Sequence, residues 1–99
     1  TMSQGPIDVE PYEGVVPDVT GLTGKVGKKT VVFRWTNPDP RDGDSYMWNL
    51  EVAGETHPPT EVTQPTVTVA ASDSGRTCIR VVLRRESGRG SAGVVECVS

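Results

Sequence analysis

Apolar residues stand at every second position along several short stretches of the chain. This period appears within residues 30–36, 46–52, 66–70 and 79–84. A period of two places alternate side chains on opposite faces of a β-strand, so each stretch predicts a strand with one buried face. The residues predicted to form the core are Val31, Phe33, Trp35, Tyr46, Trp48, Leu50, Val67, Val69, Ile79, Val81 and Leu83.

The segments between these stretches are rich in Gly, Pro, Asn and Asp, which favour turns. Residues 53–65 contain three prolines and can supply at most a short edge strand, because proline cannot donate to a ladder of hydrogen bonds. An irregular first strand within residues 19–26 and a last strand around residues 94–98 bring the number to about seven. This pattern predicts an all-β sandwich of antiparallel strands in two sheets.

Composition supports this prediction and indicates a single domain. The 99 residues include 16 Val and 11 Thr but only 3 Leu, and Val and Thr suit a pleated sheet better than a helix. Residues 1–16 are acidic, rich in Gly and Pro and without a period, which predicts a flexible linker or N-terminal arm before a domain at residues 17–99. No apolar run approaches the ~18 residues of a membrane-crossing helix, so membrane insertion of this segment is not expected.

Several short motifs also occur in a recognisable order. Trp35 ends an alternating strand, a proline-bearing loop follows at 37–39, a strand at 46–50 opens with tyrosine, and a Gly-x-Gly loop lies at 88–90. In this order the motifs resemble those of a fibronectin type III domain, over residues 17–98. The resemblance implies an immunoglobulin-like β-sandwich. The tyrosine that this family usually has at the entry to its sixth strand is absent.

The last two strands are predicted to form a hairpin with a definite register. Val81 is expected to face Val94, and Leu83 to face Ala92. This register brings the carboxylate of Glu96 next to the core, so we expect a bulge or an exposed sheet edge there.

The same register places Cys78 directly opposite Cys97, within reach of a disulfide. A bridge across 19 residues would contribute roughly 3 kcal/mol in the chain-entropy model and would compensate for the missing tyrosine. It would also indicate an oxidising compartment. The alternative is two reduced thiols in a cytosolic domain.

Charge is unevenly distributed along the chain. The net charge of −3 and the pI near 5.0 disfavour nucleic acid as a partner. The loop at 37–44 holds Asp39, Asp42 and Asp44, whereas residues 76–90 hold five arginines. In an immunoglobulin-like sandwich the loops at 37–44 and 84–90 emerge at the same end. They either pair with each other or present arginines to a carboxylate, sulfate or phosphate. The candidate ligand-binding residues are Arg84, Arg85, Arg89, Asp42 and Asp44.

Other site chemistry is not expected, and neither is catalysis. The single histidine, His57, lies in a proline-rich loop and is predicted to be exposed. Asp39, Asp42 and Asp44 are not spaced as in a calcium loop, and Arg41 lies among them, so turn formation is their expected role. No phosphate-binding or dinucleotide-binding motif occurs, and no metal or cofactor is predicted.

The sequence therefore predicts a monomeric, non-catalytic interaction or spacer module of a larger extracellular or cell-surface bacterial protein. Its end loops would contact a protein or carbohydrate partner, or neighbouring domains of the same chain. Two alternatives remain. One is a stand-alone domain that binds an anionic ligand, such as an acidic glycan or teichoic acid, through the arginines of the 84–90 loop. The other is the extracellular sensor region of a membrane serine/threonine kinase.

Overall fold

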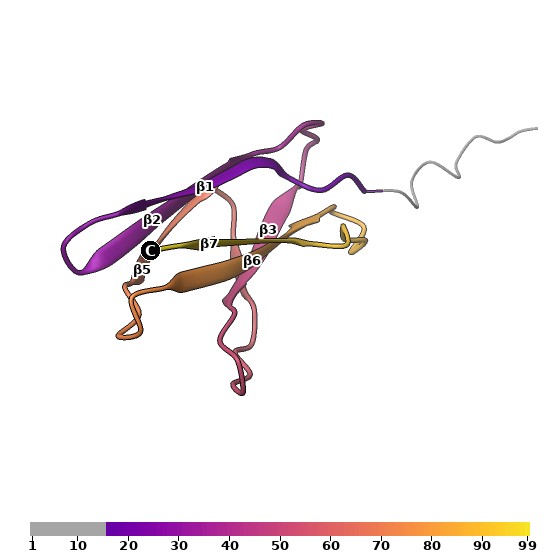
Figure 1. The fold of residues 1–99 in the computed structure, drawn as a ribbon. Coiled ribbons are helices and arrows are strands. Elements are labelled where there is room, and N and C mark those ends of the chain that lie inside the picture. The colour runs from indigo at the N-terminus through magenta and orange to yellow at the C-terminus, as the bar shows by residue number, and fades with distance from the viewer. Residues whose placement is uncertain (1–15) are drawn as a thin grey trace, which may run out of the picture.

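The computed structural model describes residues 16–99, in which the chain forms seven strands (Figure 1). Every pairing between them is antiparallel. Among the described residues no helix is long and apolar enough to cross a membrane. The strands are β1 (Thr20–Val26), β2 (Thr30–Thr36), β3 (Ser45–Leu50), β4 (Thr60–Val62), β5 (Thr66–Ala70), β6 (Thr77–Arg84) and β7 (Val94–Val98).

The seven strands form two sheets that enclose one core. Three strands lie in the order β1-β2-β5, and four lie in the order β4-β3-β6-β7. The predicted all-β sandwich of seven antiparallel strands is thereby confirmed. The fourth strand pairs with β3, whereas a constant-type immunoglobulin domain places its fourth strand on the opposite sheet.

The core consists mainly of the alternating residues that the sequence indicated. Nine of the eleven predicted core residues are buried, and Val19 and Leu22 join them. Trp48 and Leu50 are only half-buried and pack against the core from the second half of β3, where Leu50 lies beyond the residues that pair with β4. Val52 was expected to continue this strand, but it lies beyond the end of β3 and is 39% exposed.

The predicted register of the last hairpin is right along most of its length. Val81 pairs with Val94, as expected. The pairing of Leu83 with Ala92 is wrong, because the carbonyl of Leu83 instead accepts a hydrogen bond from the backbone N–H of Ser91 at 2.8 Å. The chain gains an extra residue near Gly93, whose φ of 105° suits glycine.

The sandwich closes tightly where β1 passes β7. A Cβ atom on Gly24 would lie 2.8 Å from a ring carbon of Phe33 and 2.9 Å from a methyl of Val98. Glycine is needed here because the two strands approach too closely for any side chain. At the other end of β7, the carboxylate of Asp18 accepts a hydrogen bond from the N–H of Gly93 at 2.8 Å. Figure 1 shows this end, where the loop after β6 lies near the approach to β1.

Candidate functional site

The loops that precede β3 and follow β6 meet around one buried arginine. Arg85 directly follows β6 and is 8% exposed. Its Nη1 donates to Oδ2 of Asp44 at 2.6 Å and to the carbonyl of Asp39 at 2.9 Å. Its Nη2 donates to Oδ2 of Asp39 at 3.1 Å. Charge-assisted hydrogen bonds of this kind are the strong ones, so Arg85 fixes the acidic loop against the end of β6.

Asp44 is the centre of this contact. Its side chain is 7% exposed, and its Oδ2 also accepts hydrogen bonds from the side chain of Asn37 at 2.9 Å and the N–H of Arg41 at 3.0 Å. Burial by itself would raise the pKa of Asp44. The hydrogen bonds from Asn37 and Arg41 and the positive charge of Arg85 outweigh it and hold the pKa below its usual range.

The five predicted ligand-binding residues therefore fall into two groups. Arg85 and Asp44 come together and bind each other. Arg84, Arg89 and Asp42 are exposed, and ligand binding by them stays a prediction.

The alternation of β6 contains the signal that identifies Arg85. Buried residues on this strand occupy positions 77, 79, 81 and 83, and position 85 continues the series. The period of two therefore predicts that Arg85 points inward and Arg84 outward. The basic character of residues 84–90 as a group does not distinguish these two arginines.

Asp39 and Asp44 of the acidic loop are both bound by arginine. Asp39 contacts both Arg85 and Arg41, with the Arg41 guanidinium 3.0 Å from its Oδ2. Within residues 16–99, no three His, Cys, Asp or Glu side chains are grouped so that they could hold a metal ion.

The two cysteines form the predicted disulfide. Cys78 and Cys97 are directly paired on β6 and β7, and their sulfurs are 2.06 Å apart. Their neighbours Thr77 and Ile79 are buried against the core, so the disulfide lies on the outer face of the four-stranded sheet. It ties the edge strand β7 to the centre of its sheet.

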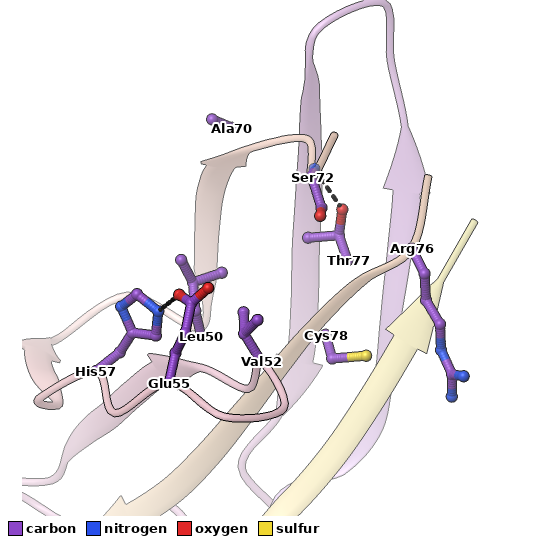
Figure 2. A pocket seen from close by; sticks show the side chains of 9 residues that line it. All are labelled: Leu50, Val52, Glu55, His57, Ala70, Ser72, Arg76, Thr77 and Cys78. Atoms are coloured by element: carbon purple, nitrogen blue, oxygen red, sulfur yellow. Dashed lines mark hydrogen bonds and ion pairs between the residues drawn. The ribbon is translucent and has the colours of Figure 1, made fainter. Parts of the chain in front are cut away.

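A shallow pocket of about 190 Å³ lies at the opposite end of β3 and β6 (Figure 2). Its apolar lining comes from Leu50, Val52 and Ala70. On its rim, Nε2 of His57 lies 2.8 Å from Oε1 of Glu55. His57 is half-buried here, so its predicted exposure was overstated.

The polar groups of this pocket do not converge on one point. Thr77 Oγ1 accepts a hydrogen bond from the N–H of Ser72 at 3.0 Å. In Figure 2 the guanidinium of Arg76 extends away from the pair formed by His57 and Glu55. The pocket therefore lacks the arrangement of nucleophile, base and oxyanion donor that acyl transfer requires.

Comparison with known proteins supports the fold. No family model matches the chain, and no curated protein matches its sequence. Among solved structures, the chain is similar to part of a bacterial orthologue of human α-L-iduronidase, with a TM-score of 0.63 and 18% sequence identity. The likeness covers 83% of this chain and 14% of that protein's chain. At this level of identity it shows a shared fold alone.

Proposed function

We propose that this chain is a fibronectin type III domain that serves as a non-catalytic interaction or spacer module of a larger extracytoplasmic bacterial protein. The observation that carries the proposal is the pairing of Arg85 with Asp39 and Asp44. These charged side chains, which could otherwise take part in catalysis, bind one another and fix the end loops. A rigid loop end suits a module that presents a surface to a partner and leaves the activity to its neighbours.

Two further observations support this assignment. The four-stranded sheet contains β4, which separates the topology from that of constant-type immunoglobulin domains. The similar part of the iduronidase orthologue is a small share of a catalytically competent enzyme. This likeness supports the proposal that the present chain also occupies an accessory position in a larger protein.

The compartment is proposed from the disulfide. Disulfides persist in oxidising environments and are rare in the cytosol. The bridge between Cys78 and Cys97 therefore supports a secreted protein or the outer side of a membrane-anchored one.

The proposal is tested in the full-length protein that contains this domain. After deletion of residues 17–99, the remaining domains should still turn over a small soluble substrate, or respond to a soluble signal, as they do in the full-length protein. It should weaken attachment to the protein's macromolecular partner or alter the spacing of its domains. Loss of small-substrate turnover while the other domains stay folded would contradict the non-catalytic role. Thiol trapping in intact cells tests the compartment, because cysteines found reduced would contradict an extracytoplasmic location.

A further inference from the structure

The outer face of the three-stranded sheet contains no carboxylate. None of the acidic residues of the chain, 13 in total, lies in β1, β2 or β5. Two exposed cations, Lys25 and Arg34, flank the half-buried Val32 on this face. Around them lie five exposed threonines: Thr23, Thr30, Thr36, Thr66 and Thr68. In a chain of net charge −3, this surface, which we call the threonine face, is locally positive and rich in hydroxyl groups.

The register of the sheet places the two cations beside each other. Arg34 pairs with Thr23, and Lys25 pairs with Val32, so the cations are diagonal neighbours on adjacent strands. Diagonal neighbours of this kind lie roughly 7–8 Å apart. Neither cation forms an ion pair within residues 16–99. Like charges on neighbouring side chains repel each other, and an anion bound by both would offset the repulsion.

A surface depression joins these groups. It has a volume of about 470 Å³ and is lined by Thr23, Gly24, Lys25, Val32 and Arg34. The depression therefore offers two positive charges, a hydroxyl group that both donates and accepts hydrogen bonds, and a small apolar surface.

We propose that the threonine face binds an acidic polysaccharide. The guanidinium of Arg34 suits a carboxylate or sulfate group, and Lys25 supplies a second cation for the next acidic group. The threonine hydroxyls match the hydroxyl groups of the sugar rings. A duplex nucleic acid fits less well, because its affinity comes from many phosphate contacts and this face supplies two cations. This inference goes beyond the proposed function and does not depend on it.

The test uses the whole chain labelled with ¹⁵N at low salt. Polygalacturonate and heparin serve as carboxylated and sulfated probes, with dextran as a neutral probe and duplex DNA as a competing polyanion. Both acidic polysaccharides should shift the amide signals of the threonine face, and dextran should not. Binding should weaken as salt is raised, because the cations are exposed to screening. The double variant Lys25→Gln/Arg34→Gln should bind at least tenfold more weakly.

The matched comparison is Arg84→Gln/Arg89→Gln, which removes the same charge from the exposed 84–90 loop, the other candidate anion site of this chain. If the threonine face is the site, this variant should bind as the unmodified chain does, and a loss of affinity confined to this variant would place the site on the loop and overturn the proposal. The proposal is overturned if neither acidic polysaccharide shifts the threonine face, if both double variants lose affinity equally, or if DNA binds there more tightly than the polysaccharides. Thermal melting of both variants distinguishes loss of binding from loss of fold. A negative result would leave the non-catalytic module intact, since the deletion experiment tests that role separately.

Discussion

Cationic side chains have opposite roles on the two sheets of this sandwich. At the end of the four-stranded sheet, Arg85 is buried and bound to Asp39 and Asp44, and Arg80 donates to the carbonyl of Ala92. On the three-stranded sheet, Arg34 is exposed and has no carboxylate on the strands beside it. The difference shows that an arginine becomes structural where carboxylates or carbonyls converge on it. Where they do not, its charge remains available to a ligand.

The largest effect is expected from breaking the buried pair. Arg85→Ala leaves Asp44 buried without its cation, which typically costs about 3–5 kcal/mol of unfolding free energy. Urea unfolding followed by tryptophan fluorescence measures it. The exposed Arg89→Ala is the control and should stay within about 0.5 kcal/mol of the unmodified chain. Similar small effects for both variants would show that Arg85 is not structural.

Removing the disulfide should also weaken the four-stranded sheet. Replacing Cys78 and Cys97 together by Ser is expected to lower the unfolding free energy by roughly 3 kcal/mol, because the unfolded chain gains freedom. The far-ultraviolet circular dichroism should keep its β-sheet form. In the unmodified, non-reduced chain, a thiol assay in denaturant should find no reactive cysteine. Two reactive thiols there would contradict the bridge.

The stability of the three-stranded sheet should depend more on packing than on charge. Gly24→Ala forces a methyl group against Phe33 and Val98, and overpacking of this kind usually costs about 1–3 kcal/mol. The control is Thr23→Ala, which changes an exposed neighbour on the same strand. If Gly24→Ala melts at the same temperature as the control, then β1 and β7 do not approach as closely as described.

Low pH should weaken the contact between Asp44 and Arg85 in particular. The pKa of Asp44 is lowered from its ordinary value of 3.8 despite its burial, through Asn37, Arg41 and Arg85. A carboxylate whose folded-state pKa is depressed stabilises the fold fully above its ordinary pKa. That stabilisation disappears as the pH falls through the folded-state value. The difference in unfolding free energy between the unmodified chain and Asp44→Asn should therefore shrink as the pH drops below 3.8. A difference that is constant across that range would contradict the role of the charge.

The smallest effect is expected on the threonine face. Lys25→Gln/Arg34→Gln removes two exposed charges that have no partner among the described residues, so the unfolding free energy should change by no more than about 0.5 kcal/mol. Urea unfolding of this double variant, measured alongside Arg85→Ala, checks the prediction. A loss comparable to that of Arg85→Ala would mean that these cations are structural, and the comparison between the sheets would fail.

Much of the fold follows from the alternation of apolar residues. The strands around Phe33, Val67 and Val81 were predictable because a period of two fixes which face is buried without reference to the rest of the chain. The disulfide followed from the register of one hairpin, which is also a local property. Position 85 continues the same alternation, so the inward direction of its side chain was also available from the sequence.

Other features depend on contacts between residues that are distant in the sequence. The need for glycine at position 24 depends on where β7 passes. The partners of Arg85 lie 41 and 46 residues away in another loop. Local sequence determines which way a side chain points, but packing of the two sheets decides what that side chain meets.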